Sequence, residues 1–363
     1  MGIAHKQMPK NQRQQLLFSF PESKAITVLL GILVLFAVGF ILHVLGSVFK
    51  PLFIALLFSF VFERPINLMR RIKIPKIIAI VVVLVITFVL FYLIGLLIYS
   101  NIDTFVTEFP RYQTNFNQFY LNIIGMLKIP HEDVSRYYRE IDWSELLQKL
   151  SIPKILSSSV GSFMNFLANL FLILLFMVYI LLGRDNLIAN MGKAFPGKRS
   201  EQFNSVFHNI NRGMQKYLVA KTLISLGTGL SATIVLLIFG VDFAWIWGLL
   251  TFVLNFIPNV GSVIATIPPI LVAVFQFDGI FRVFWVALLL ITIQMTWGNI
   301  IEPAFMGKSL NLSPLVVIFS LIFWGFIWGP IGMILAVPIA SAVQIVCANI
   351  DTLKPISIMM GDP

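Results

Sequence analysis

The sequence predicts an all-α, polytopic transmembrane protein with about eight spans, broken or re-entrant helices in its C-terminal half and amphipathic interfacial helices. Of its 363 residues, 58% are hydrophobic and 12% are charged, against roughly a quarter charged in soluble domains. Asp, Glu, Lys and Arg are absent from residues 155–183, 243–277 and 309–350. Apolar residues run continuously there instead of alternating, which favours helices over barrel strands.

The N-terminal part is expected to hold the first membrane helices. A cytoplasmic tail, residues 1–24, precedes a transmembrane region over 25–101, with expected spans at 25–47, 51–62 and 77–101. The loop at 63–76 is rich in Arg and Lys, which indicates the cytoplasmic side by the positive-inside rule. Residues 102–154 have no excess of Arg and Lys over Asp and Glu, and they are expected to form an extracytoplasmic amphipathic segment. Its helically spaced aromatic and apolar residues are Phe105, Phe109, Tyr112, Phe116, Phe119 and Ile123.

The rest of the chain is expected to return to the cytoplasm and cross again several times. A transmembrane helix over 155–183 is followed by a cytoplasmic amphipathic helix over 184–217. A transmembrane region with broken helices then covers 218–350, and a cytoplasmic tail covers 351–363. The expected spans in this region are 218–240, 243–257, 283–301, 312–328 and 330–349. Residues 258–277 are expected either to cross the membrane or to re-enter from one side.

The stretch "NFIPNVGSVIATIPP", residues 255–269, is predicted to be a broken helix at membrane depth. Proline cannot donate a backbone hydrogen bond, and glycine tolerates unusual torsions. Backbone groups freed in this way survive only in protein or around a water-filled cavity, and transporters build substrate and ion sites from them. A simple kink in a packed bundle is the alternative. The transport-path candidates here are Asn255, Pro258, Asn259, Gly261, Ser262 and Pro268.

A second polar motif, "NIIEPAFMGKSLNLSP" at 299–314, separates two apolar stretches. Its acid, Glu302, is the strongest candidate in the chain for a cation- or proton-linked group, the alternative being a carboxylate at headgroup level. Lys308 is expected either to pair with Glu302 or to anchor the chain at the cytoplasmic face. The candidates in and before this motif are Gln294, Asn299, Glu302, Pro303, Gly307, Lys308, Asn311 and Pro314.

A third stretch, "FWGFIWGPIGMILAVP" at 323–338, combines small residues with prolines. Small residues at this spacing let helices approach closely, so a packing hinge is favoured over a ligand site. The residues concerned are Gly325, Gly329, Pro330, Gly332 and Pro338.

Several classes of function are not indicated. The chain has no P-loop, no His-Glu-x-x-His and no Gly-x-Ser-x-Gly motif, so neither an enzyme nor a cofactor is expected. The single cysteine, Cys347, excludes an intrachain disulfide and a cysteine-clustered metal site, and no metal is expected. The net charge of +10 is attributed to basic residues flanking the spans and not to nucleic-acid binding. No charged residue is expected at the centre of a span.

The motifs "NFIPNVGSVIATIPP", "GNIIEPAFMGKSLNLSPLVV" and "GPIGMILAVPIA" closely resemble those of the autoinducer-2 exporter (AI-2E) family. The resemblance implies a bacterial or archaeal cytoplasmic-membrane permease that assembles as a homo-oligomer, such as a pentamer. Its namesake activity is export of a furanone-type quorum-sensing signal, and other members are associated with sodium/proton antiport. Asn259, where an aromatic residue is usual, and Ser262, where proline is common, depart from the pattern. The residues that match the family pattern are Pro258, Gly261, Pro268, Glu302, Pro303, Gly307, Pro314, Gly332 and Pro338.

These observations lead us to expect a transporter or permease that exports a small polar organic solute by a secondary mechanism. A sodium/proton antiporter and a non-transporting membrane scaffold remain as alternatives. The expected partners are the lipid bilayer, the solute, a sodium ion or proton and further copies of the chain. The expected location is the bacterial inner membrane, with both termini in the cytoplasm.

Overall fold

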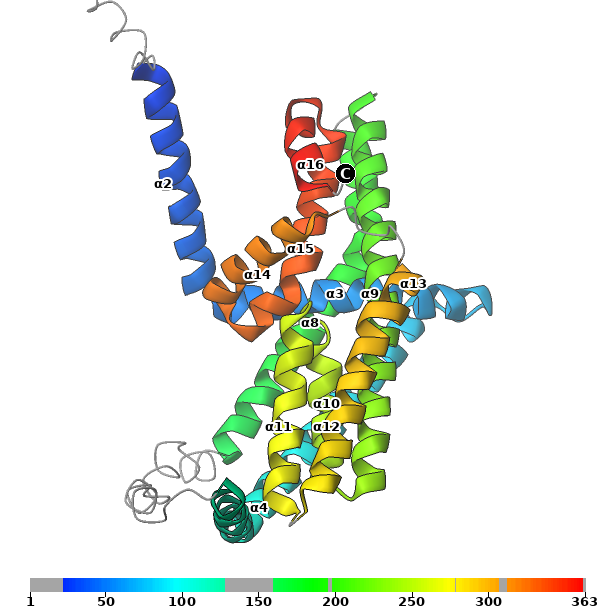
Figure 1. Cartoon of the computed structure of the whole chain (residues 1–363). Helices are drawn as coiled ribbons and strands as arrows, with labels where there is room; N and C mark the ends of the chain where they lie inside the picture. Colours follow the sequence, from blue (N-terminus) through cyan, green and yellow to red (C-terminus); the bar gives the residue numbers. More distant parts are fainter. Residues whose placement is uncertain (1–21, 128–158, 195–197, 278, 307–311, 362–363) are drawn as a thin grey trace, which may run out of the picture. The chain divides into compact units, whose positions relative to one another are not determined.

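The computed structural model describes residues 22–127, 159–194, 198–277, 279–306 and 312–361. Throughout these ranges every regular element is a helix (Figure 1). The chain divides into two units, residues 1–49 and 50–363. The first unit holds α2 (Glu22–Val44) and the start of α3 (Gly46–Arg71). Most large apolar side chains of α2 are exposed, as suits a helix in contact with lipid.

Helices long and apolar enough to cross a membrane number six among the described residues, which confirms the predicted polytopic helical protein. These candidate spans are Gly46–Arg71, Lys76–Asn101, Met164–Arg184, Asn204–Phe239, Ile280–Phe305 and Pro330–Asn349. Four shorter apolar helices accompany them: Leu29–Val44, Ala244–Leu254, Val260–Gln276 and Pro314–Trp328.

Several helices continue beyond the limits that we expected from hydropathy. The expected loop at 63–76 is helical as far as Arg71. Helix α4 (Lys76–Leu127) joins the third expected span to the start of the extracytoplasmic segment, and α9 (Lys198–Phe239) joins the expected cytoplasmic helix to the span after it. A change from apolar to polar residues marks where a helix leaves the hydrocarbon, but the backbone hydrogen bonds have no reason to stop there. Helix α8 (Ser159–Ala194) likewise runs past residue 183.

Residues 258–277 run back alongside the preceding helix toward residue 240. Helix α10 (Ala244–Leu254) and helix α11 (Val260–Gln276) form a hairpin. At its open end, the Gln276 amide nitrogen donates to the carbonyl of Gly240 at 2.7 Å, and the Asp242 backbone N–H donates to Gln276 Oε1 at 2.8 Å. The two ends of the hairpin therefore meet at residues 240–242 and 276. At about 1.5 Å per residue, the 11-residue α10 would span only about half of a bilayer core.

The break in the hairpin is confined to residues 255–259. Asn259 has a φ of 58°, outside the helical region, and α11 starts at the next residue. Pro268 and Pro269 lie inside α11 and do not interrupt it, so the break predicted within 255–269 falls at 255–259. Gly261 is buried in the first turn of α11, where a Cβ would collide with the Leu254 carbonyl. The tip therefore closes only because position 261 has no side chain.

Helix α9 is the element on which the C-terminal half is assembled. Its second half packs against α10 and α12 (Ile280–Met295), and α11 packs on both of these helices (Figure 1). This contact buries a core of Ala232, Leu236, Val241, Ala244, Val272, Ala273, Val286 and Leu290. The first half of α9 packs against α15 (Pro330–Asn349), with Tyr217, Leu218, Val337 and Ala340 buried together. Both halves of α9 are thus fixed by neighbouring helices.

The glycine-rich stretch forms a second tight hairpin, α14 (Pro314–Trp328) and α15. Gly329, with φ of 67°, makes the turn, and Pro330 occupies the first turn of α15. A Cβ on Gly332 would collide with the Trp324 carbonyl, and one on Gly325 would press on Met333. The short helix α16 (Lys354–Met360) follows α15. Its Met360 carbonyl accepts a hydrogen bond of 2.8 Å from the backbone N–H of Ser313, at the start of α14.

The extension of α4 beyond its span attaches to the open end of the α10–α11 hairpin. The Tyr112 hydroxyl donates to Asp242 Oδ2 at 2.8 Å, and the Asn115 amide donates to the carbonyl of Gln276 at 3.3 Å. Tyr112 is 5% exposed. The other residues expected on this amphipathic face have side chains outside the described set. We name the contact of Tyr112 and Asn115 with Asp242 and Gln276 the α4 latch.

Replacing Tyr112 with Phe is expected to lower the thermal midpoint of the purified protein in detergent. The change removes a hydrogen bond to a carboxylate, worth about 1–3 kcal/mol where the group is buried, and leaves the ring in place. Tyr179→Phe, on an exposed face of α8, is the matched control. Equal midpoints for the two variants would mean that the latch adds no stability.

Gly261→Ala is expected to destabilise the hairpin tip by about 1–3 kcal/mol, because the new methyl group meets a backbone carbonyl that cannot move aside. Thermal unfolding in detergent measures the effect. Gly183→Ala in α8 is the control: its Cβ meets nothing within 4 Å, and alanine favours a helix by about 1 kcal/mol. If Gly261→Ala unfolded at the same temperature as the unmodified protein, the close approach of residue 261 to the Leu254 carbonyl would be contradicted.

Candidate functional site

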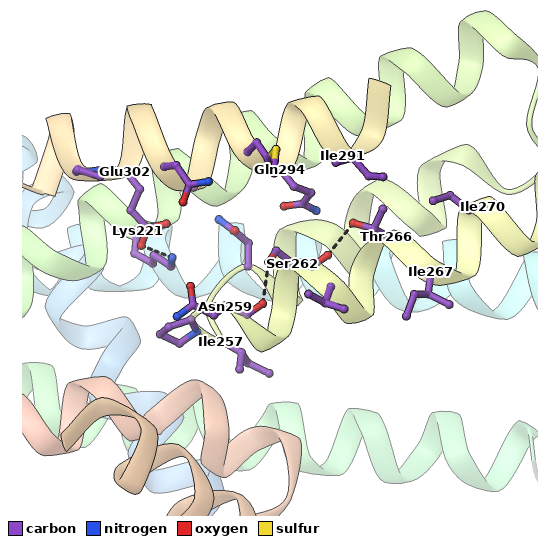
Figure 2. Close-up of a pocket in the computed structure, with 17 residues that line it drawn as sticks. Lys221, Ile257, Asn259, Ser262, Thr266, Ile267, Ile270, Ile291, Gln294 and Glu302 are labelled. Carbon is purple, nitrogen blue, oxygen red and sulfur yellow. Dashed lines mark hydrogen bonds and ion pairs between the residues drawn. The ribbon is translucent and has the colours of Figure 1, made fainter. Parts of the chain in front are cut away.

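A cavity of about 740 Å³ lies between the tip of the α10–α11 hairpin, α11, α12 and the middle of α9 (Figure 2). One part of its lining is polar: Lys221, Asn255, Asn259, Ser262, Thr266, Gln294, Asn299 and Glu302. The other part is mainly apolar: Ile257, Pro258, Val263, Ile267, Ile270, Ile291, Met295, Gly298 and Pro303. Small-molecule sites usually have this composition, a mostly apolar wall with a few polar groups that orient the ligand.

The hairpin tip supplies the amides and hydroxyls at one side of the cavity. Asn255, 8% exposed, donates from its amide to Ser225 Oγ on α9 at 3.1 Å. The Ser262 hydroxyl donates to the carbonyl of Asn259 at 2.8 Å, and the Thr266 hydroxyl donates to the carbonyl of Ser262 at 2.7 Å (Figure 2). The Ser262 bond satisfies a carbonyl that the helix break leaves open. The side-chain oxygens can still accept further bonds from a ligand.

The opposite side comes from a helix with a widened turn. Helix α12 continues into a π-helix, η1 (Thr296–Ile301), and then into α13 (Glu302–Met306). Single π turns inside α-helices are frequent at functional sites. Here the Trp297 indole donates to Ser231 Oγ at 3.2 Å, and its ring covers Gly227, where a Cβ would collide with it. This contact fixes η1 against α9, beside the cavity.

Lys221 and Glu302 form an ion pair at one end of the cavity (Figure 2). The Lys221 ammonium donates to Glu302 Oε1 at 2.5 Å. Both side chains line the cavity, but that of Lys221 is only 2% exposed and that of Glu302 is 24% exposed, so the acid is the more accessible member. An isolated ion inside a protein costs several kcal/mol even after relaxation, so each charge depends on the other.

The expectation that no span carries a charge at its centre was wrong. Lys221 lies at the middle of the candidate span Asn204–Phe239. The expected span begins at residue 218, which would put Lys221 near its edge, whereas the helix begins at Lys198. A sequence signal exists: this lysine stands between apolar turns, at helical spacing from Ser225 and Thr228, which are also buried. A polar stripe on an apolar helix indicates an interior face.

The structure brings two separate motifs together around the cavity. Eight sequence-derived candidates line it: Asn255, Pro258, Asn259, Ser262, Gln294, Asn299, Glu302 and Pro303. Gly261 and Pro268 do not line it; both lie in α11. Pro314 begins α14, away from the lining. Gly307, Lys308 and Asn311 lie outside the described residues, and the partner of Glu302 in the described part of the chain is Lys221.

The donor set of the cavity does not resemble a transition-metal site. Among the described residues no group of three or more His, Cys, Asp or Glu side chains lies close enough to hold a metal. Cys347 is buried in α15 and does not line the cavity. The chemistry available in the cavity is therefore hydrogen bonding by amides and hydroxyls and charge interaction through one carboxylate and one ammonium.

Comparison with known proteins identifies the kind of molecule to which this cavity belongs. The model of the AI-2E family transporters matches residues 30–351. The chain is 31% identical to the AI-2 transport protein TqsA of Escherichia coli K12 over 348 residues, which is 93% of this chain and 95% of the relative. It is 28% identical to a candidate transport protein of Borreliella burgdorferi over 316 residues, 87% of this chain and 85% of the relative. The chain belongs to the AI-2E family of transporters.

Proposed function

We propose that the protein exports a small polar organic solute across the bacterial inner membrane by a secondary mechanism, and that the cavity is its solute site. The observation that carries the proposal is the cavity itself, in which the tip of the α10–α11 hairpin faces a π-helix and the Lys221–Glu302 ion pair. Its volume of about 740 Å³ lies within the range of about 300–1,000 Å³ that is usual for small-molecule sites.

The lining favours a compact solute with several hydroxyl or carbonyl groups. Gln294 and Asn299 on one side, and Asn259 on the other, can both donate and accept hydrogen bonds. The isoleucines further along the cavity suit an apolar edge of the same molecule. The Escherichia coli relative is named an AI-2 transport protein, so autoinducer-2, a furanone-type signal, is the first solute to test. Asn259 and Ser262 add an amide and a hydroxyl to the lining, which favours a solute with several hydroxyl groups.

The ion pair is proposed to couple solute movement to a change of conformation. A group that binds Glu302 must compete with Lys221 for the same carboxylate. Lys221 is almost fully buried, so it does not remain charged there after losing its partner without a rearrangement of the helices around it. The hairpin tip, which contacts α9 through Asn255 and Ser225, is the nearest element that could move. The proposal includes a homo-oligomer, such as a pentamer, with both termini in the cytoplasm.

Sodium/proton antiport is the second candidate, and the ion pair is the observation that favours it. One cation bound at Glu302 would neutralise the carboxylate and leave the Lys221 ammonium without a counter-charge. Release of one proton from Lys221 would restore the balance of charge, giving exchange of one sodium ion for one proton. A second carboxylate in the path is then not needed, because the buried Lys221 serves as the second exchanging group beside Glu302.

Variants of the ion pair test whether its charges serve transport or only stability. Glu302→Gln should lower stability by about 3–5 kcal/mol, because it strands the Lys221 ammonium in a buried position. The double variant Lys221→Gln/Glu302→Gln should recover most of that loss, since two amides can hydrogen-bond, but should still lack transport. Thermal unfolding and flux are measured on the same preparations. The exposed pair Lys354–Asp351 provides the control, Lys354→Gln/Asp351→Asn, with both properties unchanged. Transport by the cavity double variant at the normal rate would remove the charges from the mechanism.

Flux in proteoliposomes distinguishes the candidate functions. Vesicles with purified protein are loaded with a labelled furanone-type signal, and sodium and proton gradients are imposed separately. We expect gradient-dependent release that stops in the cavity double variant. Sodium-dependent collapse of a pH gradient without release would establish the antiporter instead. Neither activity, in protein that is folded and correctly inserted, would favour the scaffold.

A further inference from the structure

The buried lysine of the solute cavity has a second set of polar groups within one helical turn. Lys221 and Ser225 are four residues apart on α9, and they are 2% and 0% exposed. Two residues at this spacing lie on the same face of a helix, about 6 Å apart. Ser225 Oγ accepts a hydrogen bond from the amide of Asn255 at 3.1 Å. A buried amide at the start of the hairpin tip therefore lies one turn from Lys221.

The direction of α10 brings its C-terminal end toward Lys221. The helix runs antiparallel to the second half of α9, since a Cβ on Gly248 would collide with Thr233 while Asn255 contacts Ser225. The chain beyond Asn255, the C-cap of α10, therefore approaches the turn of α9 that carries Lys221. The last carbonyls of a helix carry about half of a negative elementary charge. The end of α10 is thus a favourable place for an ammonium group.

Asn255 also offers a specific acceptor. Its nitrogen donates to Ser225, so its Oδ1 is the atom left to accept, and the described part of the chain places no donor on that oxygen. Asn255 lines the same cavity as Lys221 and Glu302. A carboxamide oxygen does not supply the charge of a carboxylate, but it can replace a carboxylate oxygen as a hydrogen-bond acceptor for an ammonium group.

We infer that Asn255 is the second acceptor of the Lys221 ammonium, which turns to it when a cation or a polar group of the solute occupies Glu302. The inference rests on the proposed function, because it supplies the step by which the ion pair opens. In the closed pair, Lys221 connects α9 to Glu302 on α13. In the open pair, it connects α9 to the hairpin tip and keeps a hydrogen bond inside the protein. Occupation of Glu302 is thereby transmitted to α10, and Asn255 acts as a positioning residue for the lysine.

Moving the carboxylate from position 302 to position 255 tests the inference. Glu302→Gln mimics a neutralised carboxylate and should lower the thermal midpoint of the full-length protein in detergent, because it leaves the buried Lys221 ammonium without its counter-charge. Adding Asn255→Asp should recover more than half of that loss, since the new carboxylate lies within reach of the same ammonium.

The matched control adds a carboxylate elsewhere in the same cavity. Gln294→Glu, also in the Glu302→Gln background, lies on α12 roughly 10 Å along the helix axis from position 302 (Figure 2). It should recover little of the lost midpoint. Equal recovery by the two carboxylates would mean that any negative charge in the cavity suffices and would overturn the role of Asn255. Absence of recovery by a folded Asn255→Asp/Glu302→Gln variant would overturn it as well.

A second cycle decides the question if Asn255→Asp/Glu302→Gln does not fold. Asn255→Leu removes the acceptor, and it should lower the midpoint more in the Glu302→Gln background than in the unmodified protein, where Lys221 is already paired. Equal losses in the two backgrounds would mean that the residues act independently and would contradict the inference. Because every readout is a midpoint and not a flux, a negative result here is distinguishable from failure of the proposed transport function, which the proteoliposome measurements report.

Discussion

The ammonium group of Lys221 imposes the strongest physical constraint on the C-terminal half of this transporter. A charge in the middle of a long apolar helix must have a counter-charge close by. Glu302, 81 residues later in the chain, provides it at 2.5 Å. To bring that carboxylate into place, α12 must pack along α9 with a widened turn held by Trp297. The tip of the α10–α11 hairpin lines the space beside the pair.

The hairpin solves a related problem of backbone hydrogen bonding. A helix that stops inside the protein exposes amides and carbonyls that lipid cannot satisfy, so its end must face polar groups or water. Here the tip is close to Asn255, Ser225, Ser262 and Thr266, whose side chains bond to one another or to the backbone. The need for polar groups at the tip and the polar surface of the cavity therefore have the same origin. A transport site can arise where a broken helix already requires hydrophilic neighbours.

The fold class and the composition of the site could be predicted from sequence because both depend on residue type. Long uncharged stretches require helical spans, and prolines with amides mark an interrupted helix. The limits of the helices could not be predicted, since polar residues end a span without ending the hydrogen bonds, as in α4 and α9. The same error in the limits of α9 concealed Lys221. Pro268 and Pro269 resemble a break, yet α11 accommodates them, because a proline lacking one hydrogen bond bends a packed helix more readily than it ends one.

The π-helix at Thr296–Ile301 has a consequence for how the family's sequence can vary. Its wide turn holds one residue more than an α-helical path of the same rise, with a smaller rotation per residue, so the extra residue is absorbed without turning the helix that follows. A deletion of one residue inside this turn would let the helix relax to regular α geometry and leave Glu302 facing α9. A deletion elsewhere in α12 has no extra residue to remove, and it would rotate Glu302 by about 100° around the helix axis. The place of a deletion in this helix therefore decides whether the only described cavity-lining carboxylate keeps its direction.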